Sequence, residues 1–418
     1  MIKKYKIYLN ILFISLIVIF LLNTNILSNF VWTHPNLFAD FKMPINWLEC
    51  HKLGFNLFTL EKIDCGTDQN ISQFNYGQAF LNLPHNDYLD NFYRNYLPWI
   101  LVFSFIFFTA KIIKTNNFIE DLLIYFAILN PSTMLMLERM QIDCIFYLTI
   151  IFCAYNRYYI FNWFLGIYFA LIKFYPISIL LTIFVEKKER SLKSVLLIIL
   201  FLSIIFFGYL IINKDYYSFM LNNMLPGKAG YHFLYSLNSF PKIFKYIFGI
   251  KYQILLLIFY SLFIFSVIKI FKKIHSNQNI IRETLYTNQS KLFFISGYFN
   301  LFLYTLVSSY AYKEVYLILS IPYILLLNEK YNLKIFKFII YLFIARYLYL
   351  FIYAFLNVHD GITFINNVRV FSNYFMFSIS IKALFDFILL SFLISVLALK
   401  TKLYLMNYIK DKTIIHQV

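Results

Sequence analysis

Polar clusters stand beside long apolar runs, and several carry residues that could do chemistry. The first cluster holds Asp40, shortly after the first apolar run. A carboxylate there can act as a general base or hold a divalent cation, or it can simply cap a helix. Charged side chains near a membrane are costly, so each such residue is a candidate functional residue. Asp40 is therefore the first candidate general base.

A second cluster, with the sequence ERMQID, covers residues 138–143. The forked guanidinium of Arg139 can pair with two phosphate oxygens, and Asp143 could orient it or bind a sugar hydroxyl. The alternative is structural, since a carboxylate in the first turn of a helix complements the helix dipole. Both interpretations place this cluster between two apolar segments.

Three further clusters follow along the chain. In the third, Lys173 precedes Tyr175 and Pro176, and its ammonium could meet a lipid phosphate or only snorkel to ordinary headgroups. The fourth holds Tyr312 and Lys313, with the same two interpretations. The fifth comprises His359, Asp360, Gly361 and Arg369, and its pattern indicates little by itself.

The composition identifies the elements that must position these clusters. Of 418 residues, 61% are hydrophobic and 14% charged, with a mean hydropathy of +0.67, whereas a soluble domain is about 25% charged. The apolar residues form runs long enough to cross a bilayer. The net charge of +17 comes from Lys and Arg between these runs rather than on one face, so no nucleic-acid partner is expected. A soluble enzyme is excluded.

Run length predicts an all-α, polytopic membrane protein with about ten full transmembrane helices. The first is an uncleaved span ending near Leu22, and both termini are predicted to be cytoplasmic because the inner loops carry most of the basic residues. Residues 163–185 are predicted to form a re-entrant hairpin with its tip near Lys173, the alternative being one tilted helix. The other spans are predicted at 96–113, 119–137, 142–157, 194–213, 252–271, 292–310, 314–328, 336–356 and 382–399.

The polar length of the chain is predicted to lie outside. We interpret residues 1–418 as a single integral-membrane domain with a large first extracytoplasmic loop, 28–95, and further outer loops at 214–251 and 357–381. Loops commonly carry function, although these could be passive connectors. Cys50 and Cys65 share the first loop and could form a disulfide there or remain two free thiols, and Cys144 and Cys153 are expected in the core. Cysteine and histidine spacing predicts no metal site.

Glycine-rich phosphate loops are not found in the sequence, so neither ATP hydrolysis nor a dinucleotide is implied. All five clusters fall on one predicted side of the membrane. Three cations there, Arg139, Lys173 and Lys313, suit an anionic lipid whose phosphate lies at the interface. The residues alone thus favour lipid-phosphate chemistry at the outer surface.

The ordered motifs resemble the GT-C superfamily of membrane glycosyltransferases, with the greatest similarity to polyprenyl-phosphate-mannose-dependent alpha-mannosyltransferases. The motifs are the Asp40–Phe41 pair, the sequence GFNLF at 54–58, ERMQID at 138–143, Lys173 to Pro176, and the Tyr312–Lys313 pair. The chain departs from the family pattern at Met140, where Gly is usual, at Gln141, where many members have Asn, and at Lys313, where Arg is common. The match extends over roughly residues 39–314.

The resemblance implies an inverting hexosyltransferase that moves a mannose-like sugar from a polyprenyl-phosphate-linked donor to a lipid or glycan acceptor. It implies a site on the extracytoplasmic face of a membrane, which we predict to be the bacterial cytoplasmic membrane. No cofactor is required by this scheme, although a divalent cation could take part. Asp40 would be the catalytic base. The donor phosphate would contact Arg139, Lys173, Tyr175 and Lys313. Substrate would also contact Glu138, Gln141, Asp143 and Tyr312.

Two other functions remain open. An O-antigen-type polymerase or ligase would depend more on Arg369 and the 357–381 loop. A polyprenyl-linked glycan flippase or transporter would place charged residues at mid-membrane depth, as Arg346 suggests.

Overall fold

The computed structural model describes residues 2–31, 33–58, 65, 76–113, 117–173, 175–185, 192–223, 234–305, 309–359, 363–365, 368–370 and 372–415. Contacts group the chain into two compact units, where the sequence indicated one membrane domain. Unit 1 comprises residues 1–33, 106–136 and 228–418, and unit 2 comprises 34–105 and 137–227. Two of the four boundaries along the chain fall inside helices, one in α4 (Leu97–Ile112) and one in α6 (Pro131–Arg139).

Unit 1 is built of helices with short 3-10 segments and two small antiparallel ladders, β1 with β2 and β3 with β4. Its elements are α1 (Ile2–Leu22), η1 (Asn25–Asn29), α5 (Phe118–Leu129), β1 (Leu234–Tyr235), α12 (Ser239–Phe248), α13 (Tyr252–His275), α14 (Gln278–Glu283), α15 (Asn288–Thr305), β2 (Ser309–Tyr310), η5 (Ala311–Ser320), α16 (Ile321–Tyr331), α17 (Lys334–His359), β3 (Thr363–Ile365), β4 (Val368–Val370) and α18 (Asn373–Ile415). Most of α6 (Pro131–Arg139) also belongs to it.

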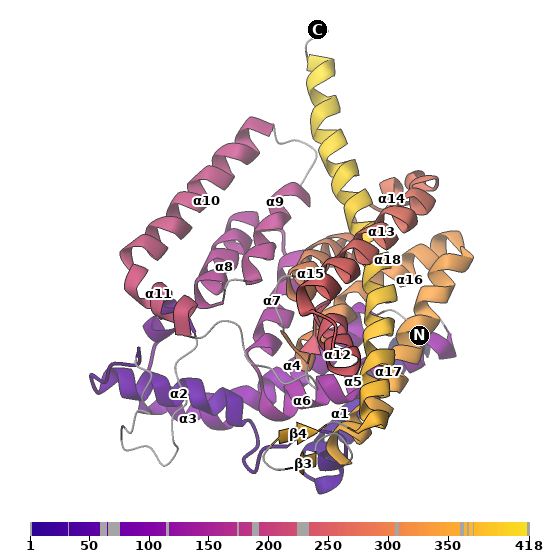
Figure 1. The fold of residues 1–418 in the computed structure, drawn as a ribbon. Coiled ribbons are helices and arrows are strands. Elements are labelled where there is room, and N and C mark those ends of the chain that lie inside the picture. The colour runs from indigo at the N-terminus through magenta and orange to yellow at the C-terminus, as the bar shows by residue number, and fades with distance from the viewer. Residues whose placement is uncertain are drawn as a thin grey trace. The chain divides into compact units, whose positions relative to one another are not determined.

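Unit 2 is helical throughout its described residues. Its elements are α2 (Ala39–Lys52), η2 (Gln78–Asn82), α3 (Asp87–Asn95), the first part of α4 (Leu97–Ile112), the end of α6, α7 (Asp143–Tyr155), α8 (Tyr159–Ile172), η3 (Tyr175–Leu181), α9 (Thr182–Val185), α10 (Leu192–Ile212) and α11 (Lys214–Asn223) (Figure 1).

Five described helices are long and apolar enough to cross a membrane, by length and composition alone. They are α1, α10, α13, α17 and α18, and two bent pairs, α3 with α4 and α5 with α6, raise the number to seven. The structure is therefore compatible with a polytopic membrane protein, although it supports fewer spans than ten. The predicted span 314–328 falls on η5 followed by α16, so it is not one continuous α-helix.

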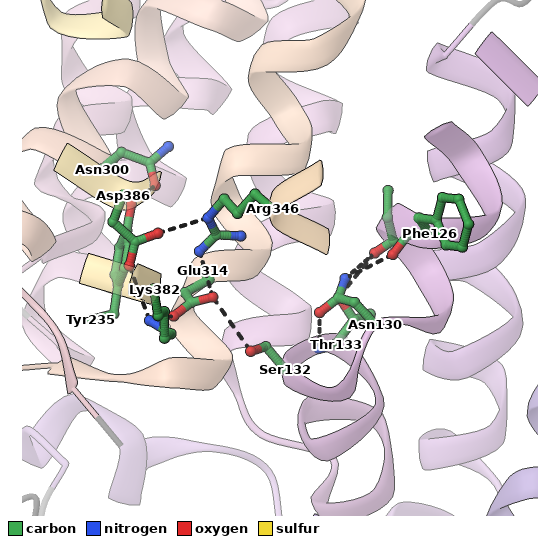
Figure 2. Close-up of polar contacts among 11 residues, drawn as sticks. Phe126, Asn130, Ser132, Thr133, Tyr235, Asn300, Glu314, Arg346, Lys382 and Asp386 are labelled. Carbon is green, nitrogen blue, oxygen red and sulfur yellow. Dashed lines mark hydrogen bonds and ion pairs between the residues drawn. The ribbon is translucent and has the colours of Figure 1, made fainter. Parts of the chain in front are cut away.

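The bend between α5 and α6, 44°, occurs at Asn130 and Pro131. The amide of Asn130 donates to the main-chain oxygen of Ala127 (2.7 Å), and its oxygen accepts from the main-chain nitrogen of Thr133 (3.1 Å) (Figure 2). One side chain thus satisfies the end of α5 and the start of α6, where helices leave main-chain groups without partners. The bend follows from these two residues.

Unit 1 has its core where α17 and α18 pack side by side, as their orange and yellow ribbons show (Figure 1). Helix α13 also packs along α18. Aliphatic and aromatic residues such as Leu350, Leu389 and Leu393 are buried there. This packing holds α17 and α18 in a fixed register, which matters for the charged residues on both.

In unit 2 the chain folds back at the break predicted from Lys173. Helix α8 ends at Ile172, Lys173 takes an extended conformation, and η3 begins at Tyr175. A Cβ on Gly166 would lie 3.1 Å from Leu180 and 3.2 Å from Ile179, so η3 packs closely against α8. The interpretation of 163–185 as one tilted helix is therefore wrong, and the hairpin is the structure of this segment.

Two helices lie within the predicted first outer loop. Arg94 of α3 donates to Asn46 of α2 (2.6 Å) and pairs with Glu49 (3.0 Å) and with Asp90 of its own helix (2.9 Å). Cys50, near the end of α2, is joined to Cys65 in a disulfide. Residues 34–58 and 76–95 of the predicted loop are thus a folded part of unit 2.

Candidate functional site

Asp40 lies in the first turn of α2 in unit 2, and its carboxylate is directed to the end of α6. Arg139 Nη1 lies 3.6 Å from Asp40 Oδ2, and the Gln141 amide donates to the same oxygen. Three residues predicted to act together from the motifs are thus in contact. The alternative that Asp40 caps a helix does not hold, because Phe38 occupies the N-cap position of α2.

The contact with Asp40 depends on a sharp change of direction between two helices. α6 ends at Arg139, Met140 has φ 49°, and α7 begins at Asp143. A positive φ is rare for a long side chain, and it turns the chain within one residue. This turn places Gln141 beside Asp40 and leaves Asp143 in the first turn of α7, fully buried.

Lys173 is held inside unit 2 by a buried aromatic residue. Its ammonium lies 4.5 Å from the ring centre of Tyr76, a cation–π contact. The Gly77 nitrogen donates to the Ile172 oxygen (2.9 Å), which fixes Tyr76 next to the end of α8. This contact argues against simple snorkelling of Lys173 to the lipid surface.

Two titratable groups of the site, the Asp40 carboxyl and the Tyr76 hydroxyl, have shifted pKa values. Burial raises the pKa of Asp40 above its ordinary value of 3.8, and the positive charges of Arg139, His34 and Lys173 oppose that rise. Burial also raises the pKa of the Tyr76 hydroxyl, and the nearby negative charges of Asp143 and Asp40 raise it further. Tyr76 therefore remains protonated, while Asp40 can exchange a proton above the usual pH range of an aspartate.

The remaining predicted site residues lie elsewhere or are only partly described. Tyr312 and Lys313 belong to η5 of unit 1, where Lys313 is buried and Tyr312 is partly exposed. Tyr175 begins η3, but its side chain lies outside the described part of the chain. His359 ends α17 and Arg369 lies in β4, whereas Asp360 and Gly361 fall outside the described residues.

Unit 1 contains a second polar cluster, which we call the ion tetrad: Glu314, Arg346, Lys382 and Asp386. Figure 2 shows the Glu314 carboxylate between Ser132 and Arg346, with Lys382 beside it. Arg346 donates to Glu314 (2.5 Å) and to Asp386 (2.6 Å), and Lys382 pairs with Asp386 (3.0 Å) and with Glu314. Each side chain is at most 3% exposed. Two cations and two anions thus neutralise each other within the core.

Sequence reasoning missed part of both clusters. Lys382 and Asp386 open a predicted span, and only their i,i+4 spacing signals an ion pair. Tyr76 belongs to a loop with no apolar periodicity, so no pattern marked it. The partners of these residues lie far away in sequence, and only the fold brings them together.

A divalent cation could be bound away from Asp40. Glu49, His85 and Asp90 each offer a ligand atom, all within 4.8 Å of one another. Arg94 already pairs with both carboxylates, so a cation there would have to displace a guanidinium. The geometry fits a metal less well than it fits Arg94.

No protein-family model, curated protein or solved structure matches this chain.

Proposed function

We propose that the site around Asp40 transfers a mannose-like hexose from a polyprenyl-phosphate-linked donor to a lipid or glycan acceptor. The observation that carries the proposal is the contact of the Asp40 carboxylate with Arg139 and Gln141, with Lys173 close enough to affect its charge. A general base beside two cations is what removal of a proton and departure of a phosphate require.

In the proposed reaction the acceptor hydroxyl oxygen attacks the anomeric carbon of the donor. The bond from that carbon to the phosphate oxygen breaks, and polyprenyl phosphate leaves with the bonding electrons. Asp40 accepts the hydroxyl proton. Arg139 and Lys173 neutralise the charge that develops on the phosphate, which is the contribution that commonly dominates such catalysis. Attack opposite the leaving group inverts the configuration.

One backbone feature supports the resemblance to the GT-C superfamily. Members usually have Gly where this chain has Met140, and that residue has a φ of 49°. Glycine adopts such a φ without steric cost. The position is one that a glycine would suit, which agrees with the alignment of the ERMQID motif on that family.

The proposal includes the finer topology: ten crossings, both termini in the cytoplasm, and the Asp40 site at the outer face of the bacterial cytoplasmic membrane.

Asp40→Asn is the variant that tests the base. We expect hexose transfer to fall at least about 100-fold, since an amide cannot accept the proton, a contribution worth about 10²–10⁴. Asp87→Asn, which changes an exposed aspartate in α3, is the matched control and should leave transfer unchanged. Near-normal transfer by Asp40→Asn, with normal amounts of protein in the membrane, would remove Asp40 from this role.

The ion tetrad favours a second candidate function, a polyprenyl-linked glycan flippase or transporter. Three of its residues lie on the candidate spans α17 and α18, where ionisable residues commonly mark transport pathways. Movement of a fluorescent polyprenyl-linked glycan between leaflets of reconstituted vesicles tests it. Movement that Lys382→Met abolishes, without any hexose transfer, would favour this function.

A further inference from the structure

Glu138 contacts the segment that leads into α2 through both its side chain and its main chain. Glu138 Oε1 accepts a hydrogen bond from the His34 main-chain nitrogen (2.9 Å). Its main-chain oxygen accepts one from the Phe38 nitrogen (2.9 Å). Since α2 begins at Ala39, these two bonds fix the backbone immediately before Asp40.

The backbone held by these bonds is conformationally unusual on both sides. Phe38 has φ 63° and ψ 30°, and Met140, two residues after Glu138, has φ 49°. Bulky residues adopt this left-handed region only where the surrounding structure enforces it. The Glu138 bonds are contacts that enforce it at Phe38, and the direction of the first turn of α2 depends on them.

Glu138 and Asp40 also share one cation. Arg139 lies between them, with Nη1 3.6 Å from Asp40 Oδ2 and Nε 3.9 Å from Glu138 Oε2. Glu138 is only 3% exposed, so water screens its charge poorly. Arg139 therefore joins the carboxylate of Glu138 to that of Asp40.

We propose that Glu138 is the positioning residue of Asp40: its side chain fixes the backbone that aims the Asp40 carboxylate at Arg139 and Gln141. The inference rests on the proposed role of Asp40 as base. A merely structural Glu138 would stabilise the fold without influencing the ionisation of Asp40.

Two variants of Glu138 test this positioning role. Glu138→Gln keeps an acceptor oxygen for the His34 nitrogen but removes the charge, whereas Glu138→Ala removes both. Glu49→Gln, which removes another carboxylate of unit 2, is the matched control. Every variant is measured in two ways: the pH dependence of hexose transfer, and the pH dependence of carbodiimide labelling at Asp40, which follows its protonation without requiring any turnover.

The labelling curve reports the protonation of Asp40, which the charged and titratable groups around Asp40 and Tyr76 can affect. These groups are His34, Tyr76, Glu138, Arg139, Asp143 and Lys173. All except Glu138 are unchanged in the variants. Arg139 lowers the Asp40 pKa. Loosening their contact in Glu138→Ala should therefore move both pH curves to higher pH, whereas Glu138→Gln should leave them in place.

We expect Glu138→Ala to lower kcat about 10- to 100-fold, the effect of losing one hydrogen bond to a charged acceptor. Glu138→Gln should keep kcat within about threefold, because the acceptor oxygen is retained. Glu49→Gln should leave the Asp40 labelling curve in place. An unmoved labelling curve in Glu138→Ala would overturn the inference while leaving the transferase proposal intact.

The two proposals can fail separately. If the wild-type protein transfers no hexose but the labelling curve still moves in Glu138→Ala, the positioning of Asp40 stands and the proposed function fails. Equal kcat in the wild type, Glu138→Gln and Glu138→Ala would overturn the positioning role.

Discussion

At the scale of single residues, the structure places Asp40, Arg139, Gln141 and Lys173 in one polar site. Their pairing could be predicted from the sequence only as an ordered set of motifs, because the residues belong to three separated segments. Tyr76 could not be predicted at all. Its contact with Lys173 depends on how a loop packs against the end of α8.

Lys173→Met should change both donor binding and the pH dependence of transfer. Removing the ammonium raises the KM for the polyprenyl-phosphate donor, since a phosphate loses a cation. It also removes a positive charge that lowers the Asp40 pKa, so that pKa rises. The base must be ionised, so the acid side of the rate profile should move to higher pH.

An unchanged donor KM and an unchanged profile in Lys173→Met would mean that this lysine only snorkels. Lys111→Met, which removes a lysine stacked on Phe107 in unit 1, is the matched control.

Gly77→Ala tests the close approach between the Tyr76 segment and α8. An added Cβ would lie 1.7 Å from the Leu171 oxygen, which belongs to the backbone and cannot rotate away. We expect a loss of about 1–3 kcal/mol or more in the free energy of unfolding, together with reduced transfer. Thermal unfolding in detergent measures it.

Gly208→Ala is the control for that substitution, because a Cβ there would meet nothing within 4 Å. It lies in helix α10, so the alanine should be neutral or stabilising. Equal stability of Gly77→Ala and the wild type would contradict the packing described for Gly77.

At the scale of elements, the long apolar runs and the break near Lys173 were predicted, whereas the breaks in two other runs were not. α1, α10, α13, α17 and α18 follow from uninterrupted hydropathy. The 3-10 helix η5 could not be predicted, because the composition of a ten-residue 3-10 helix resembles that of a short membrane span. The two helices of the first outer loop were also missed, because a polar loop gives no apolar period long enough to indicate α2.

The ion tetrad gives an element-scale prediction. Lys382→Met leaves an excess of buried negative charge and should cost about 3–5 kcal/mol of unfolding free energy. Adding Asp386→Leu removes one charge of each sign and leaves Arg346 paired with Glu314, so most of that loss should be recovered. Unfolding in detergent compares the two.

If the double variant is less stable than Lys382→Met alone, charge neutrality does not govern this core. Lys330→Met is the matched control, since its pair with Glu283 is exposed and should contribute less than about 1 kcal/mol.

The disulfide between Cys50 and Cys65 closes a loop with a sequence separation of 15. Constraining such a loop stabilises a fold by about 2–4 kcal/mol. We expect the double variant Cys50→Ser and Cys65→Ser to lose a similar amount. Replacing the buried thiols Cys144 and Cys153 with Ala is the control, and it should leave the non-reducing gel mobility unchanged.

At the scale of the whole molecule, the composition predicted a helical membrane protein, and the structure is compatible with one. Ten crossings were predicted, and the described residues contain five to seven candidate spans. The bend at Asn130 and Pro131, inside a predicted span, could not be predicted, because apolar run length does not register a bend. The division into two units could not be predicted either. Each unit draws on distant parts of the chain, and apolar runs carry no information on which other runs they contact.

The proposed orientation can be tested by labelling with an impermeant maleimide in intact cells. Tyr88→Cys lies in the predicted first outer loop and is 91% exposed in the wild type, so it should be labelled. Asn277→Cys, also exposed, follows α13 in a predicted inner loop and should be labelled only after the cells are opened. The reverse pattern would place the Asp40 site on the cytoplasmic side.

The most direct measurement of the central claim is release of polyprenyl phosphate from a labelled polyprenyl-phosphate hexose by the purified wild-type protein, with a nucleotide-linked hexose as the parallel donor. The account predicts release of polyprenyl phosphate with matching incorporation of hexose into the acceptor, and no transfer from the nucleotide donor. Transfer from the nucleotide-linked sugar, or no release from the polyprenyl donor with any lipid or glycan acceptor, would contradict it.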